Sequence, residues 1–220
     1  MNNMTIRTLE PAGPADAALI LMHGLGTTGD TFAPMGRRLQ AAVRAPLRVV
    51  LPTAPKQPVT LMGGQPTTAW FDLRDPDFRL EQDAEGIEAA GGVLASLVGN
   101  QIDTGIEPER IIVAGFSQGA ALSIRVGTGL PYKLAGIASL SGWFLLPNRT
   151  RSEHSTSATG VPVFVGHGTD DRVAPSSWIR PARTWLEEAG HEVAWHSYPI
   201  GHAINDQEIA DLGAWVDQLL

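Results

Sequence analysis

A serine between two glycines, at the junction of an apolar run and a helix-favouring segment, constrains this chain more than any other feature. The pattern G-x-S-x-G occupies residues 115–119, with Ser117 at its centre, after the apolar run 111–114 and before the helix-favouring segment 120–124. In a nucleophile elbow of this form, a strand turns sharply into a helix and holds the serine in a strained conformation with its Oγ exposed. Glycines are expected on either side because a Cβ there would collide with a neighbouring strand or helix.

The rest of the chain alternates between apolar runs and amphipathic segments, which predicts an α/β fold. Strands are expected at 18–22, 48–51, 111–114, 134–140, 161–165 and 192–198. Helices are expected at 31–43, 83–100, 176–189 and 206–219, besides the helix after the elbow. Such alternation implies a mostly parallel sheet with helices on both faces. Because α/β folds of 220 residues commonly form one domain, we expect a single domain over 1–220.

The segment 53–70 differs from the rest because it contains three prolines and two glycines. These residues break regular structure, so the segment is predicted to be a long irregular loop. Long loops inside compact domains are usually functional. No segment is long enough to form a large cap domain, so any pocket is expected to be fairly open.

Charge and cysteine content exclude several classes of partner and chemistry. The formal net charge is −7 and no run of Lys or Arg occurs, which excludes nucleic acid and anionic membrane surfaces as expected partners. The absence of cysteine excludes disulfides, thiolate metal sites and a cysteine nucleophile. The N-terminus shows no secretory signal, and the apolar run 17–22 is too short to span a bilayer. We therefore expect a cytoplasmic protein with no stable membrane insertion.

The acid that would support a catalytic serine is expected in the loop after strand 161–165. A serine hydroxyl needs a base, and the base needs a carboxylate that fixes its tautomer. In α/β-hydrolases the acid and then the histidine follow the serine along the chain. The loop contains Asp170 and Asp171, and one of them is expected to be only a turn or N-cap residue. A metal bound by this pair is disfavoured, since adjacent carboxylates diverge and no histidine ligand stands at suitable spacing.

Three histidines, His191, His196 and His202, follow these aspartates. His191 lies in a turn at the opposite end of the sheet and is expected to be solvated. His196 lies inside the last strand. His202 directly follows that strand, at the end of the sheet where catalytic loops gather, and is the predicted base.

Stabilisation of an oxyanion needs two backbone N–H donors. Gln118 follows the serine and begins the next helix, so its N–H is the first predicted donor. The second is expected in the loop after an early strand. Residues 23–26 read His-Gly-Leu-Gly, whose glycines allow backbone to approach a substrate, and Leu25 is the predicted donor.

Together these segments resemble the phospholipase/carboxylesterase family of small α/β-hydrolases, which includes bacterial carboxylesterases and acyl-protein thioesterases. The matching segments are 21–29, 51–55, 69–72, 115–119, 167–175 and 198–202. Segment 58–64 resembles the bacterial carboxylesterase branch more than the eukaryotic thioesterases, although Met62 stands where that branch is expected to have asparagine. In the family the acid stands four residues before a proline, which implies Asp171 rather than Asp170.

The resemblance implies an α/β-hydrolase fold and a serine carboxylesterase that acts on small-molecule esters. The open pocket predicts short- to medium-length acyl chains. It implies Ser117, Asp171 and His202 as the triad, with no metal or cofactor. An acyl-protein or small-molecule thioesterase, lysophospholipase-like, uses the same machinery and is the alternative. A non-catalytic hydrolase-like binding module is a remote alternative, because the chain keeps all three triad residues. The resemblance also implies a homodimer, which no helix or strand edge in the sequence specifies.

The acyl pocket is expected to be apolar and to lie near the loops at the catalytic edge of the sheet. A packing role in the core is the alternative for each candidate residue. The candidates are Leu61, Met62, Trp70, Trp143, Phe144 and Leu145.

Overall fold

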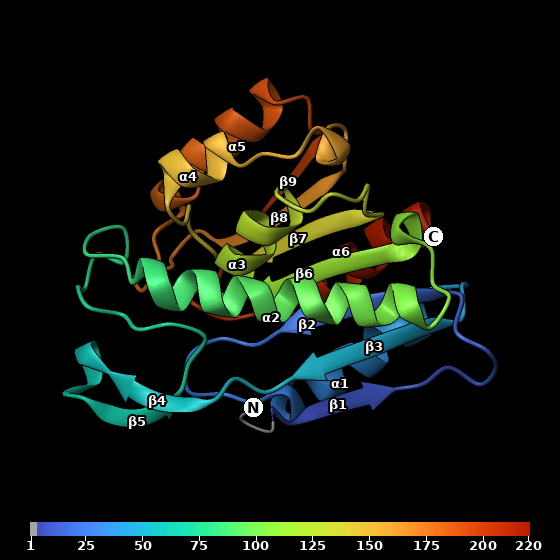
Figure 1. Cartoon of the computed structure of the whole chain (residues 1–220), viewed down its shortest axis with the longest axis horizontal. Coiled ribbons are helices and arrows are strands. Elements are labelled where there is room, and N and C mark those ends of the chain that lie inside the picture. The colour runs from blue at the N-terminus through green and yellow to red at the C-terminus, as the bar shows by residue number, and fades with distance from the viewer. Residues whose placement is uncertain (1–3) are drawn as a thin grey trace.

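A seven-stranded, mostly parallel sheet forms the centre of the molecule (Figure 1). The computed structural model describes residues 4–220. The strand order is β1-β3-β2-β6-β7-β8-β9, and β1 alone pairs antiparallel within this sheet, with β3. The strands are β1 Ile6–Leu9, β2 Ala17–Met22, β3 Leu47–Pro52, β6 Ile111–Phe116, β7 Gly136–Leu140, β8 Val163–Gly168 and β9 Val193–Tyr198.

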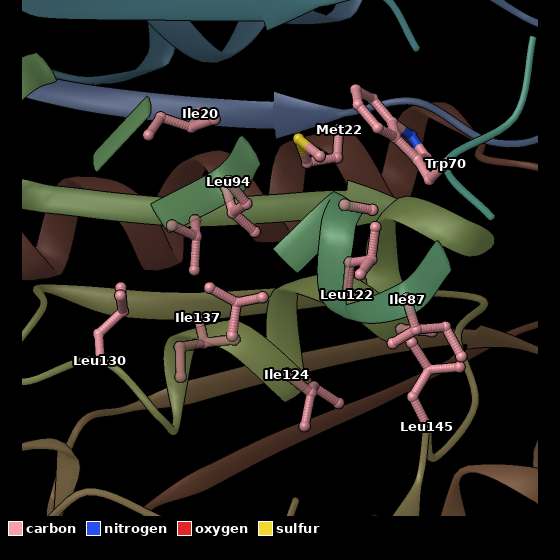
Figure 2. Close-up of a cluster of buried hydrophobic side chains, with 14 of the residues drawn as sticks. Ile20, Met22, Trp70, Ile87, Leu94, Leu122, Ile124, Leu130, Ile137 and Leu145 are labelled. Atoms are coloured by element: carbon pink, nitrogen blue, oxygen red, sulfur yellow. The ribbon is translucent and has the colours of Figure 1, made fainter. Parts of the chain in front are cut away.

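Helices cover both faces of the sheet, so that each face has its own apolar core. One core is formed against α1 and α6, and the other against α2, α3 and α5. In the view of Figure 1, α2 and α3 lie in front of the sheet, and Figure 2 shows the core on this face, to which Leu94, Leu122 and Ile137 belong. The helices are α1 Gly29–Ala42, α2 Ala84–Asp103, α3 Gln118–Gly127, α4 Pro147–Ser152, α5 Arg180–Glu188 and α6 Asp206–Leu219. The α/β-hydrolase fold without a large cap is confirmed.

The segment 53–70 is not irregular, contrary to the prediction. It contains the antiparallel hairpin of β4 Lys56–Val59 and β5 Gln65–Thr68, connected by a 3₁₀ turn. Pro58 pairs directly with Pro66, which is tolerated because alternate pairs in an antiparallel ladder exchange no N–H···O bonds. The turn closes through Gly63 and Gly64, at φ of 67° and 77°. The prolines and glycines of this segment thus belong to a hairpin rather than to an irregular loop.

Other departures from the predicted elements are small. The sequence did not predict β1, a four-residue edge strand, or the short helix α4. The expected helix 176–189 is divided into a 3₁₀ turn and α5, because Pro181 stands in the first turn of α5 and favours a helix start. Among the helices of residues 4–220, none combines the length and apolarity that crossing a bilayer would need.

Candidate active site

Ser117 lies at the tip of the turn between β6 and α3, in a conformation that side-chain-bearing residues rarely adopt. Its backbone angles are φ 55° and ψ −116°. The neighbouring strand holds this turn in place, because the Ser117 N–H donates to the carbonyl of Leu140 at 2.9 Å. Strain of this kind persists only where the surrounding structure fixes it, and it concentrates at functional sites.

The two glycines of the elbow are sterically required, as the sequence predicted. A Cβ on Gly115 would lie 2.2 Å from the carbonyl carbon of Gly119. A Cβ on Gly119 would lie 2.4 Å from the carbonyl oxygen of Met22. Both obstacles are backbone, which cannot move aside as a flexible side chain can, so the elbow depends on glycine at both positions.

The loops after β8 and β9 bring Asp171 and His202 to the serine. His202 Nδ1 lies 2.8 Å from Asp171 Oδ2, and His202 Nε2 lies 2.9 Å from Ser117 Oγ. Since an ionised carboxylate only accepts, Nδ1 carries the proton and Nε2 is left to accept from the serine hydroxyl. The three predicted residues therefore form one continuous hydrogen-bonded chain.

Asp171 is held in place from both sides of its carboxylate. Its Oδ1 accepts from the backbone N–H groups of Val173 and Ala174, at 3.0 and 2.9 Å. Its side chain is fully buried, whereas Asp170 is exposed to solvent. The geometry thus favours Asp171 over Asp170 as the partner of His202.

Close backbone contacts join the loop that carries Asp171 to the loop that carries His202. The N–H of Thr169 donates to Tyr198 at 2.8 Å, and the N–H of Asp170 donates to Ile200 at 3.0 Å. A Cβ on Gly168 would lie 2.4 Å from the carbonyl oxygen of Gly201. The glycine after His167 therefore allows the two loops to meet.

His167 supports this loop, a role that the sequence did not reveal. It is buried, and its Nε2–H donates to the carbonyl of Ala174 at 2.7 Å. Burial lowers the pKa of His167, so the ring is neutral beside Asp171 and does not compete with His202 for its charge. The sequence feature that could have indicated this supporting role is the position of His167 at the end of a buried strand.

The loop that follows β2 carries Leu25 past the elbow. A Cβ on Gly24 would meet the Phe116 ring at 3.0 Å and Ser117 Cβ at 3.2 Å, so this backbone passes directly beside the serine. His23 fixes the loop: its Nδ1–H donates to Gly24 at 2.7 Å, and its Nε2 accepts from the N–H of Ala54 at 2.9 Å. Burial lowers the pKa of His23, which keeps the ring in the neutral form that this pair of bonds requires.

Gln118 joins the elbow to the segment that follows the hairpin. Its buried side chain accepts from the N–H of Trp70 at 3.1 Å and donates to the carbonyl of Phe71 at 2.8 Å. Its own N–H is at the first position of α3, where no intrahelical acceptor exists. The hairpin also contacts the Leu25 loop, since the Gly26 N–H donates to Thr68 at 2.8 Å.

Comparison with known proteins identifies the family. A model of the family described as Phospholipase/Carboxylesterase matches residues 3–220. The chain belongs to this family. It is 33% identical over 207 residues to acyl-protein thioesterase 1 of Yarrowia lipolytica, covering 92% of this chain and 91% of that protein. Other fungal proteins of the same name are 30% to 36% identical.

Solved structures agree with this placement. A variant of Arabidopsis thaliana SOBER1 superposes with a TM-score of 0.87 at 27% identity, over 92% of this chain and 99% of that one. The structure of esterase PE8 superposes with a TM-score of 0.83 at 27% identity, over 99% of both chains. Thioesterase and esterase names thus both occur among the relatives of this phospholipase/carboxylesterase-family chain.

In this family member, four of the six residues predicted for the acyl pocket lie in the core instead. Trp70, Trp143, Phe144 and Leu145 are all buried, and Figure 2 shows Trp70 and Leu145 in the core under α2 and α3. Phe144 stacks on Trp185, with ring centroids 5.3 Å apart. Large apolar side chains near strand ends serve packing as readily as binding, and the sequence could not separate these uses.

Leu61 and Met62 are the two pocket candidates that lie at the surface. They sit in the 3₁₀ turn of the hairpin and are 37% and 48% exposed. Met62 Sδ accepts from the Thr67 hydroxyl at 3.5 Å. Of the six candidates, only these two have side chains exposed to solvent.

His191, which was not chosen as the catalytic base, is not solvated, contrary to the prediction. His191 is buried, with Nδ1 2.9 Å from the carbonyl of Val161 and Nε2 3.0 Å from Nε2 of His154. Its position in a turn led to the wrong expectation, because the segment before β8 covers that turn. Within residues 4–220, no group of three His, Cys, Asp or Glu side chains is arranged to hold a metal ion.

Proposed function

We propose that this protein is a serine hydrolase that cleaves acyl thioesters, with carboxylic esters as its second substrate class. The observation that carries the proposal is the chain of hydrogen bonds from Ser117 Oγ through His202 to Asp171, at 2.9 and 2.8 Å. This arrangement has one chemical use that explains all three residues, which is the activation of a serine for acyl transfer.

The first half-reaction transfers the acyl group to the enzyme. Ser117 Oγ attacks the carbonyl carbon while its proton passes to His202 Nε2, and Asp171 stabilises the imidazolium that forms. The N–H groups of Leu25 and Gln118 are the proposed donors to the oxyanion. The bond to sulfur or oxygen then breaks, and His202 returns the proton to the departing thiol or alcohol.

The second half-reaction releases the acid. Water takes the position of the leaving group, gives its proton to His202 Nε2 and attacks the acyl-enzyme carbonyl. Collapse of the new oxyanion breaks the bond to Ser117 Oγ, which recovers the proton from His202. The cycle consumes one water and needs no redox partner.

Thioesters rank first because relatives that are 33% and 36% identical to this chain are named acyl-protein thioesterases. Carboxylic esters rank second, supported by the likeness to esterase PE8. Both reactions use the same machinery, and a thiol is the better leaving group. Leu61 and Met62 are the proposed acyl contacts, and their small exposed surface favours short to medium acyl chains. The similarity of segment 58–64 to bacterial carboxylesterases stays a prediction.

A paired substrate panel tests this proposal. Thioesters and p-nitrophenyl esters of acetate, butyrate, octanoate and palmitate are assayed with the wild type and with Ser117→Ala. Loss of the serine should lower the rate on the order of 10⁵-fold or more, and thioesters should be favoured over esters of the same acyl group.

Other outcomes are equally informative. A preference for esters in every pair would move the assignment to a carboxylesterase, and palmitate exceeding butyrate would contradict the proposed chain length. No hydrolysis of any substrate by folded protein, without modification of Ser117 by a fluorophosphonate, would favour the non-catalytic binding module.

A further inference from the structure

An apolar cavity that is wide open to solvent lies beside His202, on the face of the sheet covered by α1 and α6. Its volume is about 360 Å³. Apolar side chains dominate its lining, which includes Phe32, Met35, Phe116, Ile204 and Ile209 together with His202. The Phe116 ring connects cavity and site, since its centroid lies 4.8 Å from that of His202 and 6.3 Å from that of Phe32.

We propose that this cavity binds the apolar part of the leaving group, the alcohol or thiol that departs when Ser117 is acylated. The proposal rests on the proposed function and adds a specificity site to it. His202 Nε2 must give its proton to the departing oxygen or sulfur, so that atom has to lie within hydrogen-bond reach of the ring. The rest of the leaving group, which is bonded to that atom, then lies next to His202. The ring of His202 also lines the cavity, so the cavity is the space available to this group.

The acyl group has a different place available. The residues that connect the hairpin to the site, Ala69 and Trp70, belong to the core on the α2 and α3 face. Phe32 and Met35 belong to the core on the α1 and α6 face. The hairpin that carries Leu61 and Met62, the proposed acyl contacts, thus adjoins one core and the cavity adjoins the other. This arrangement suits a substrate with two arms extending from one carbonyl.

The cavity walls come from two helices that are joined at the rim. Arg38 of α1 contacts Asp206, the first residue of α6, at 2.5 Å. This pair is exposed and contributes little stability by itself, but it neutralises the charged guanidinium at the rim. The interior is therefore suited to an uncharged aromatic or branched alkyl group, and unsuited to a bare ammonium or carboxylate.

The test varies the leaving group and the acyl group separately. Ethyl butyrate, benzyl butyrate and ethyl octanoate are compared by kcat/KM in the wild type, Ile209→Trp and Ala210→Trp. Ile209 lines the cavity, whereas Ala210 is the next residue of α6 and is exposed, so it controls for a new tryptophan on this helix. Filling the cavity should lower the benzyl-to-ethyl ratio roughly 10-fold or more, the usual effect of excluding an apolar group from its pocket.

The octanoate-to-butyrate ratio should stay unchanged in Ile209→Trp, and all ratios should stay unchanged in Ala210→Trp. An unchanged benzyl-to-ethyl ratio in folded Ile209→Trp would overturn the proposal. A change in the acyl ratio instead would make the cavity an acyl site, which also overturns it.

Two controls keep the outcomes separable. If Ile209→Trp does not fold, Ile209→Ala replaces it, and the enlarged cavity should raise the rate for a naphthylmethyl ester relative to the benzyl ester severalfold; no rise counts against the site. Labelling of Ser117 by a fluorophosphonate reports the proposed function independently. A labelled serine with no leaving-group effect rejects the cavity alone, whereas an unlabelled serine and no hydrolysis reject the enzyme and the cavity together.

Discussion

At the candidate site, the elbow and its two supporting loops are buried and held by backbone hydrogen bonds, whereas the turn of the β4–β5 hairpin is exposed. Ser117 is 6% exposed and Asp171 is 6% exposed, and backbone bonds hold both. The 3₁₀ turn of the hairpin contains no buried residue, and Met62 at its end is 48% exposed. The hairpin reaches the site only through a few bonds, such as Gly26 to Thr68.

This difference distinguishes the residues proposed for the chemical step from the residues proposed to select the acyl chain. The residues proposed for bond breaking are fixed by the sheet, whose core and steric constraints leave them one conformation. The residues proposed to choose the acyl chain sit on a small two-stranded unit that can vary without disturbing the sheet. Substitutions in the first region should therefore affect turnover or folding strongly, and substitutions in the second should shift preference mildly.

The largest predicted effect separates the two neighbouring aspartates. Asp171→Asn should lower kcat/KM by roughly 10³- to 10⁴-fold, because an amide cannot hold the His202 tautomer or stabilise the imidazolium. Asp170→Asn, the matched control, should change it less than about twofold, since that side chain is exposed. Steady-state kinetics on one ester checks both, and the reverse order would reassign the acid.

The next effect concerns folding of the elbow. In Gly119→Ala the new Cβ would lie 2.4 Å from the Met22 carbonyl oxygen, so we expect a loss of about 3 kcal/mol or more in the free energy of unfolding. Gly92→Ala is the control, because nothing lies within 4 Å of its Cβ position on the exposed face of α2. It should stabilise by about 1 kcal/mol. Urea denaturation measures both, and equal midpoints would mean that the elbow is not sterically closed.

A buried acid provides a pH test of the rigid region. Glu208 of α6 is buried against Gly166 of β8, and neither carboxylate oxygen has a hydrogen-bond partner within residues 4–220. Burial, with a smaller contribution from Asp211, raises the pKa of Glu208 from 4.5 to about 7. The unfolded chain therefore releases this proton first as pH rises, and stability should fall between about pH 4.5 and about pH 7.

Glu208→Gln removes that loss while keeping the shape of the side chain. The variant should gain stability relative to wild type on going from acidic to mildly alkaline buffer, by about 3 kcal/mol at most. Thermal melts in the two buffers measure the change. A constant difference between variant and wild type would show that the carboxyl is solvated in the protein.

The smallest effect belongs to the hairpin. Met62→Ala should change the octanoate-to-butyrate ratio by a few-fold, since only part of the side chain contacts a substrate, and it should leave the melting temperature unchanged. Kinetics on the two esters and one melt check this. A loss of turnover on both esters with no change in their ratio would place Met62 among the residues that support the chemistry.

The same contrast explains which features could be predicted from the sequence. The order of strand ends, with Ser117, Asp171 and His202 each after a buried strand, is a local pattern, and the sheet brings such ends together. The burial of Trp143 and the pairing of Pro58 with Pro66 depend on contacts between distant segments. No local pattern contains that information, which is why the pocket candidates and the hairpin were misjudged.

The most direct test of the central claim is the intact mass of the protein after reaction with a fluorophosphonate. We expect one adduct per chain, located on Ser117, lost in Ser117→Ala and formed far more slowly in His202→Ala. Folded wild-type protein that gains no adduct, or Ser117→Ala that gains the same adduct, would contradict it.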